Sequence, residues 1–425
     1  MKLLNRNFVL LWQGQFVSQM GNQAFVIAMA FWIKHATGSA TLMGLVMMVG
    51  QIPSVILAPV AGVVADRFRR KRIIIVSDIL RGLAVLALAG FMYVAPDRTD
   101  SIVVALFICI TFLSILGSFF RPAMSAAIPD LVPPERLSAA NSMNQASMQL
   151  STFLGQGAGG VLFRVLGAPL LFLIDGITYL VSAVSESFID IPYRPPQDSN
   201  SAETKYRRYR RQIIEGFRYI WGRPGLRTLV FAAAILNFFL LPILVLMPFY
   251  VEDFLRSTPD WYGFIVAGFG AGALLGYLWA GALRVSGQLR STLMLMSLTA
   301  QAVMLGSLGL TGSRFVALAV LIATGVLNGF LNINIATIVQ LTTPTEIRGR
   351  VFSLLSMVTG GLAPLAMGLS GIVADLVDQN VPLIYIVCGG ITAVLSLAVS
   401  FSRPFRDFLA YEPPSDSSGE PASAR

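Results

Sequence analysis

The stretch GVVADRFRRKR, residues 62–72, crowds charge between two long apolar runs. Its single acid, Asp66, is followed by five cations, Arg67, Arg69, Arg70, Lys71 and Arg72. The whole chain of 425 residues is 55% hydrophobic and 12% charged, whereas soluble domains carry roughly 25% charged residues. This composition predicts a membrane protein in which the stretch is a short loop between two membrane-spanning helices.

Twelve apolar runs are long enough to cross a bilayer, which takes about 20 residues in a helix. Their expected bounds are 8–33, 41–65, 73–95, 101–121, 141–166, 168–190, 228–252, 260–283, 290–310, 314–340, 351–376 and 381–402. Most connections are short, and one long connection separates six spans from six. We therefore expect an all-α membrane protein of two six-helix bundles. The predicted parts are the bundles 1–190 and 228–403, a cytoplasmic linker 191–227 and a disordered tail 404–425.

Aromatic and aliphatic residues recur at helical spacing in the linker, with arginines between them. They are Tyr206, Tyr209, Ile213, Phe217 and Ile220. The pattern predicts either an amphipathic helix on the inner membrane surface or a solvated linker helix.

Loop charges predict the orientation of the chain. With the N-terminus inside, 25 of the 31 Lys and Arg residues fall in inner loops or termini and five in outer turns. Inner loops are the ones enriched in Lys and Arg, so both termini are expected in the cytoplasm of a bacterial-type inner membrane. The net charge of +9 is carried by these loops, which argues against a nucleic-acid partner.

Two segments indicate an internal repeat: PPERLSAANSM, residues 133–143, and PTEIRGRVFSL, residues 344–354. Three residues match at one constant offset: Pro133 with Pro344, Glu135 with Glu346, and Ser142 with Ser353. The segments precede the fifth and the eleventh span, which are equivalent positions in two parallel, pseudo-symmetric halves. Such halves are a transporter plan, with a substrate site near mid-membrane.

The opening stretch resembles the loop between spans two and three of the major facilitator superfamily. Gly62, Asp66, Arg67, Arg70 and Lys71 match its pattern, while Arg69 stands where many members have glycine. The segments PDLVPPERLSAANSMNQ, LFLIDGITYLVSA, IIEGFRYI and PTEIRGRVFSLL resemble the branch that contains macrolide-efflux proteins and the enterobactin exporter. The resemblance covers essentially the whole chain.

This resemblance implies a latch formed by the loop aspartate. In the family, that aspartate meets the N-terminus of the eleventh helix when the inner side is closed, and the partial positive charge of a helix N-terminus favours the contact. Here the partner helix is expected to start near Arg350, which together with Arg348 could bond to Asp66. The alternative is that the cations serve only to orient the loop.

Charged residues inside the spans need a reason, because they are costly in hydrocarbon. Asp78 and Arg81 are three residues apart on one helix face and are expected to pair or to join the latch. Asp175 is the candidate for proton coupling, and the alternative is a packing acid bonded to Thr178 or Tyr179. Glu186, near the inner end of its span, is expected to face water or headgroups.

Amide side chains form a further set of candidates. Gln15, Gln19 and Asn22 share one face of the first span, where they would line a central cavity or bond to other helices. Possible counterparts in other spans are Asn144, Asn237, Asn328 and Asn332.

The sequence contains no Walker motif, no nucleophile with a base and a single histidine, His35, so neither an enzyme nor a metal or other cofactor is expected. We expect a monomeric secondary transporter that exports amphipathic molecules, such as a drug, macrolide or siderophore, by proton antiport. Its partners would be the small-molecule substrate, protons and membrane lipid. The alternatives are a nutrient or lysophospholipid transporter, or a membrane sensor or scaffold that does not transport.

Overall fold

The computed structural model describes residues 5–191, 211, 214–282 and 287–412, without the side chains of Pro59, Val63, Asp66 and Arg67. Within these residues the chain is helical and contains no strand. The expected all-α class is confirmed.

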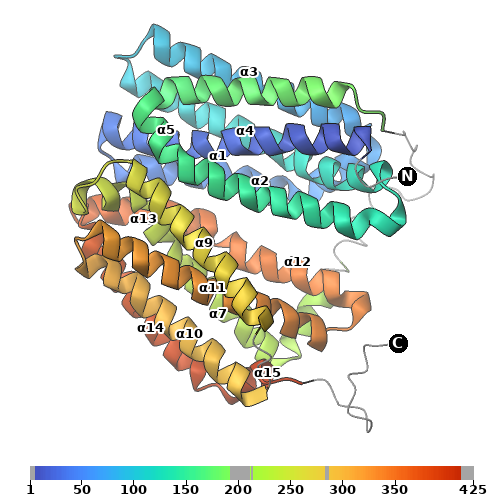
Figure 1. The fold of residues 1–425 in the computed structure, drawn as a ribbon, viewed down its shortest axis with the longest axis vertical. Helices are drawn as coiled ribbons and strands as arrows, with labels where there is room; N and C mark the ends of the chain where they lie inside the picture. Colours follow the sequence, from blue (N-terminus) through green and yellow to red (C-terminus); the bar gives the residue numbers. More distant parts are fainter. Residues whose placement is uncertain (1–4, 192–210, 212–213, 283–286, 413–425) are drawn as a thin grey trace. The chain divides into compact units, whose positions relative to one another are not determined.

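The first half of the chain forms long helices, drawn in blue to green in Figure 1. They are α1 (Arg6–Thr37), α2 (Ala40–Arg67), α3 (Arg70–Val94), α4 (Thr99–Leu131), the short 3-10 helix η1 (Pro134–Arg136) and α5 (Leu137–Ser187). Residues 214–221 are also helical. The linker residues Tyr206, Tyr209 and Ile213 lie outside the described residues.

The second half forms α7 (Pro224–Val245), α8 (Met247–Phe249), the π-helix η2 (Tyr250–Phe254), α9 (Asp260–Ala282), α10 (Gly287–Ser307), the 3-10 helix η3 (Leu308–Leu310), α11 (Arg314–Thr342), α12 (Thr345–Gly361), α13 (Ala363–Leu376), α14 (Val381–Ser400) and α15 (Arg403–Leu409). The short α15 buries Phe405 and Leu409, so residues 404–409 belong to the folded structure rather than to a disordered tail. The tail beyond residue 412 lies outside the described residues.

Eleven helices of the described residues are long and apolar enough to cross a membrane, with α12 and α13 counted as one. One of the eleven, α5, contains two spans. Gly167 breaks its helical geometry with φ 73° and ψ 167°, a conformation that favours glycine. The break lies between the predicted fifth and sixth spans, and the twelve-span architecture is confirmed.

The chain divides into two compact units. Unit 1 comprises Met1–Ser199, Val245–Ala267 and Pro364–Gln379, and unit 2 comprises Asn200–Leu244, Gly268–Ala363 and Asn380–Arg425. Two short segments from the second half of the chain therefore pack with helices of the first half. The division into bundles 1–190 and 228–403 stays a prediction.

Helix packing in unit 1 centres on α5. α1 and α3 both pack against α5, and α4 packs against α2 and α3. At the predicted inner ends of these helices, an apolar cluster includes Phe8, Leu11, Ile74, Ala127 and Ala140. Because α1 and α3 both pack against α5, the side chains of α5 that lie between them are shielded from solvent.

Glycines bring α9 and α11 together in unit 2. A Cβ added at Gly272 would lie 2.1 Å from the carbonyl oxygen of Ile322, and one added at Gly325 would lie 2.1 Å from that of Phe269. Gly276 and Gly329 repeat the arrangement one turn further along. Small residues at such spacing let backbones approach closely in membranes.

Candidate functional site

A polar stripe runs along the buried face of α5. Asp175, Tyr179, Ser182 and Glu186 recur at helical spacing, and each is at most 5% exposed. From residue 175 to residue 186 the stripe extends about 16 Å along the axis at about 1.5 Å per residue. This is about half of the roughly 30 Å of hydrocarbon that a span crosses.

Gln15 on α1 connects this stripe to α3. Its side-chain Nε2 donates to Glu186 Oε1 at 2.7 Å and to Asp78 Oδ2 at 3.3 Å. It also lies 3.3 Å from the hydroxyl of Ser182. Two carboxyl groups from different helices therefore share one amide donor.

Asp78 pairs with Arg81 one turn further along α3. Arg81 Nη1 lies 3.4 Å from Asp78 Oδ1, and both side chains are buried. The guanidinium also lies over the ring of Phe120, 4.5 Å from its centroid, and 5.7 Å from the ring centroid of Tyr179. These aromatic faces add cation–π attraction where water is excluded.

We call Asp78, Asp175 and Glu186, with Gln15 and Arg81, the carboxylate cluster. It holds three carboxyl groups and one guanidinium, all nearly closed to solvent. Among the described residues, Glu186 Oε2 and both carboxyl oxygens of Asp175 have no hydrogen-bond partner. An unpaired buried carboxylate is strongly disfavoured, so the cluster as packed is suited to holding at least one proton.

Asp175 lies directly against α1. A Cβ added at Gly21 would come within 2.7 Å of Asp175 Oδ1. The Thr178 hydroxyl donates to the main-chain carbonyl of Asp175 at 2.8 Å, and the Tyr179 hydroxyl donates to Asn22 Oδ1 at 3.2 Å. Both interpretations of Asp175, a proton-coupling residue and a packing acid beside neighbouring hydroxyls, stay predictions.

Glu186 is the cluster member that the sequence did not single out. It was expected to face water or headgroups, and that expectation is wrong, because Glu186 is 1% exposed. The packing of α1 and α3 on α5 encloses it. Its spacing from Asp175, Tyr179 and Ser182 was the available sequence signal.

The cations of the opening stretch contact neighbouring helix ends. Arg70 pairs with Asp130 and donates to the carbonyl of Ala126 at 2.7 Å. Lys71 Nζ donates to the carbonyl of Ser187 at 2.7 Å. Gly62 has open space around it. The side chains of Asp66 and Arg67 lie outside the described ones, so the latch stays a prediction.

The expected latch partners on α12 make contacts within unit 2. Arg350 pairs with Glu215, which also accepts from Arg211 Nε at 2.8 Å. Arg348 donates to the carbonyl of Thr343 at 3.4 Å. Glu215, an acid in an arginine-rich linker, is a partner that sequence reasoning missed.

The amide candidates are dispersed. Gln15 is buried in the carboxylate cluster, whereas Gln19, Asn22, Asn144 and Asn328 are half-buried and Asn237 and Asn332 are exposed. Asn332 donates to Asn328 Oδ1 at 2.8 Å. Exposed amides within apolar spans favour a water-filled cavity over lipid, and their lining of such a cavity stays a prediction.

Comparison with known proteins identifies the family. The sequence profile of the transmembrane secretion effector family of major facilitator transporters matches residues 2–421. The chain belongs to the major facilitator superfamily. This membership confirms the resemblance of the opening stretch and makes the chain an integral, multi-pass membrane transporter.

Two relatives of this major facilitator protein are named as efflux proteins. Macrolide efflux protein A of Streptococcus pyogenes is 26% identical over 381 residues, covering 88% of this chain and 90% of the relative. Multidrug efflux pump Tap of Mycolicibacterium fortuitum is 27% identical over 367 residues, covering 84% and 86%. Among solved structures, the nucleoside transporter NupG superimposes with a TM-score of 0.70 at 14% identity, covering 94% of this chain and all of that one. This last likeness shows the fold alone.

Proposed function

We propose that this major facilitator protein exports amphipathic small molecules by proton antiport, and that the carboxylate cluster couples proton movement to transport. The observation that carries the proposal is the enclosure of three carboxyl groups beside a single guanidinium. The two relatives named as a macrolide efflux protein and a multidrug efflux pump support the direction and the substrate class.

Charge balance supports proton binding in the cluster. Arg81 offsets one negative charge, and it is paired with Asp78. Asp175 and Glu186 would each add an uncompensated charge in the membrane interior, so each is most stable with a proton bound. When an alternating-access transporter exposes one of them to water, that carboxyl group can release its proton.

The length of the stripe suits a relay. Asp175 lies toward the predicted outer end of the sixth span and Glu186 toward the predicted inner end, about 16 Å apart along α5. In the proposed antiport, protons reach Asp175 from outside and leave from Glu186 to the cytoplasm. Export of substrate proceeds in the opposite direction.

The substrate is proposed to be neutral or weakly cationic. The amides Asn237, Asn328 and Asn332 in the second half carry no charge, and Asn237 and Asn332 are exposed within apolar spans. Uncharged amides satisfy the polar groups of a drug, macrolide or siderophore without an ionic partner. In this proposal the protein works as a monomer in a bacterial inner membrane, with both termini in the cytoplasm.

The test uses inverted membrane vesicles with an imposed pH gradient. Uptake of a macrolide, a cationic dye and a siderophore is measured for the wild type, Asp175→Asn and Glu186→Gln. Asp190→Asn is the matched control, because Asp190 is an exposed acid just beyond the end of α5. We expect protonophore-sensitive uptake of one compound by the wild type and the control. The two cluster variants should keep downhill exchange and lose gradient-driven uptake.

Two results would overturn the proposal in separable ways. Gradient-driven uptake that persists in both cluster variants removes the cluster from coupling. If no compound moves in the wild type, export of this class is wrong, and nutrient uptake, lysophospholipid movement or sensing without transport becomes the next hypothesis.

A further inference from the structure

Two segments of the second half of the chain contact the α1–α2 turn inside unit 1. One contains η2, and the other contains α13 except for its first residue. The turn lies where α1 ends at Thr37 and α2 begins at Ala40, with Gly38 at φ 64°. By the distribution of Lys and Arg, this turn is on the predicted outer side.

Asp375, in the last turn of α13, caps the N-terminus of α2. Its Oδ1 accepts from the main-chain N–H of Ala40 at 3.1 Å, and its Oδ2 accepts from that of Thr41 at 2.8 Å. The hydroxyl of Ser39 donates to Oδ2 at 2.9 Å. The first turn of α2 contains no acid of its own. An acid from another helix therefore supplies the negative charge that a helix N-terminus favours.

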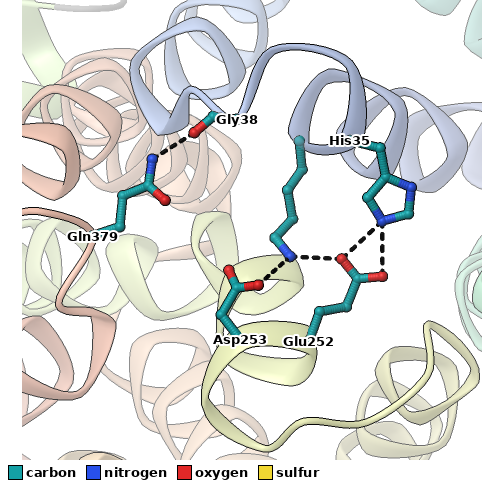
Figure 2. Close-up of polar contacts among 6 residues, drawn as sticks. His35, Gly38, Glu252, Asp253 and Gln379 are labelled. Carbon is teal, nitrogen blue, oxygen red and sulfur yellow. Dashed lines mark hydrogen bonds and ion pairs between the residues drawn. The ribbon is translucent and has the colours of Figure 1, made fainter.

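Gln379 holds this carboxylate in place. Its side-chain Nε2 donates to Asp375 Oδ1 at 3.0 Å and also to the carbonyl of Gly38, a contact drawn in Figure 2. Asp375 is thus oriented by its own segment while it contacts α2.

Lys34 makes a second contact at the same end. Its Nζ lies 2.6 Å from Glu252 Oε2 and 2.8 Å from Asp253 Oδ1, and the side chain is 8% exposed. His35 Nε2 lies 2.9 Å from each carboxyl oxygen of Glu252, as Figure 2 shows. Burial by itself would raise the pKa of Glu252, but hydrogen bonds from His35 and Lys34 and their charges hold it below its usual 4.5.

The backbones of α2 and α13 meet closely beside Asp375. A Cβ added at Gly371 would lie 2.2 Å from the carbonyl oxygen of Ala40, and one added at Gly44 would lie 2.5 Å from that of Met367. Thr41 Oγ also donates to the carbonyl of Gly371 at 3.3 Å. Such contact cannot persist when the two helices separate.

The Asp375 contact has a predicted counterpart at the other end of α2. α2 has Asp66 in its last turn, and the span formed by α12 and α13 has Asp375 in its last turn. The two spans run antiparallel in the predicted topology, so the latch predicted for Asp66 would involve the N-terminus of the span that Asp375 ends. The contact of Asp375 has the three α2 donors described above, whereas that of Asp66 rests on the family resemblance.

We propose that Asp375 is a positioning residue of the transport cycle, whose carboxylate on the N-terminus of α2 holds the outer side closed and leaves it when the outer side opens. Lys34 with Glu252 and Asp253 supports the same closure; these residues together with Asp375 are called the outer latch. The proposal rests on membership of a transporter family and on the predicted orientation. It needs neither proton coupling nor export.

The experiment measures cysteine accessibility from each side of the membrane. The buried Cys109 and Cys388 are first replaced by alanine. The outer reporter is Met48→Cys, because the Met48 sulfur occupies the space beside Gly368 between α2 and α13. The inner reporter is Asn141→Cys, near the predicted inner start of α5 and exposed. An impermeant maleimide is applied to right-side-out and to inverted vesicles.

Asp375→Asn should raise outer labelling roughly two- to fivefold, the shift expected from losing one charge at a helix terminus. Inner labelling should fall in the same variant, because alternating access opens one side as it closes the other. Asp375→Glu should restore part of the wild-type pattern. Asp378→Asn is the matched control, since Asp378 is exposed three residues further along and asparagine tolerates its φ of 52°.

A second variant keeps the test decisive if Asp375→Asn fails to fold. Gly371→Ala places a methyl group against the carbonyl of Ala40 and should also raise outer labelling while lowering inner labelling. Unchanged outer labelling in the folded variants overturns the proposal. A rise on both sides also overturns it, because that pattern reports loosening of the protein and not a shift between two states.

Discussion

Glycines bring helix backbones together in both units, but the first five helices and the helix pair α9–α11 differ in the side chains that their contacts bury. In unit 1, α1, α3 and α5 enclose three carboxyl groups, an arginine and a glutamine. In unit 2, α9 and α11 meet through four glycines with almost no space between their backbones. Among the described residues of unit 2, the buried charged side chain is Arg290, which donates to the carbonyls of Leu409 and Tyr411 near the helix ends.

Two halves of one superfamily plan have therefore diverged in chemistry. Burying ionisable groups is costly and is retained where protonation or charge has a use. Glycine contacts give close packing without that cost. This comparison supports the proposal that coupling lies in the first half of the chain.

The largest effect is expected from Arg81→Met. It leaves Asp78 without its charge partner in a closed site, and breaking a buried pair typically costs about 3–5 kcal/mol. Thermal unfolding in detergent should show the loss, and adding Asp78→Asn should recover much of it. Arg290→Met is the comparison from unit 2, with a smaller expected cost because its hydrogen bonds go to neutral carbonyls and the nearby carboxylate, Glu412, is exposed. Equal costs for the two arginines, or no recovery in the double variant, would remove the distinction between the halves.

A smaller effect is expected from Gly325→Ala in α11. The added methyl group would meet the carbonyl of Phe269, and overpacking of this kind costs about 1–3 kcal/mol. Unfolding temperature should fall while the proton dependence of transport stays as in the wild type. Gly312→Ala is the control, because Gly312 has open space around it. A change in proton dependence would show that the second half takes part in coupling.

A binding effect is expected from Asn332→Ala. Losing one hydrogen bond to substrate is worth about 0.5–1.5 kcal/mol, so KM should rise roughly two- to tenfold with the proton-to-substrate ratio unchanged. The measurement is substrate uptake with simultaneous proton flux in liposomes. Thr337→Ala, another exposed polar residue on α11, serves as control. An altered ratio would contradict the division of roles.

The smallest effect is expected from mild acid on the outer latch. Glu252 faces Lys34 and His35 of α1, with Asp253 beside it, and its pKa lies below 4.5. A lowered pKa means that its pairing is fully present above 4.5 and is lost only as pH falls through the lowered value. Spin labels at Ala36→Cys and Arg256→Cys should therefore keep the same separation at about pH 7 and about pH 5.5. If the two labels move apart at about pH 5.5, a group other than Glu252 controls this end of the protein.

Much of the fold could be predicted from hydropathy. The twelve spans follow from apolar runs, and the break between residues 166 and 168 coincides with the non-helical Gly167. The pairing of Asp78 with Arg81 follows from their spacing on one helix. These features depend on residues close together in the sequence.

The candidate site could be predicted only in part. Gln15, Asp78, Arg81 and Asp175 were chosen for three separate roles, and the structure places Gln15, Asp78 and Arg81 together with Glu186. Glu186 was wrongly predicted to face water or headgroups. An acid near the end of a span does so unless neighbouring helices cover it, and the sequence does not show which helices pack there. The cap of α2 by Asp375 joins residues more than 300 positions apart in the chain and has no local signal.

Composition, apolar run length and the loop motif act locally, and they were enough to predict a helical membrane transporter of the major facilitator superfamily. Which polar groups share a closed space depends instead on how the helices pack. The packing among α1, α3 and α5 decides which face of each helix is buried. Two acids from different helices become neighbours only when their buried faces meet. Burying charge costs free energy, so these polar groups behave differently when they are packed together than their separate positions in the sequence would indicate.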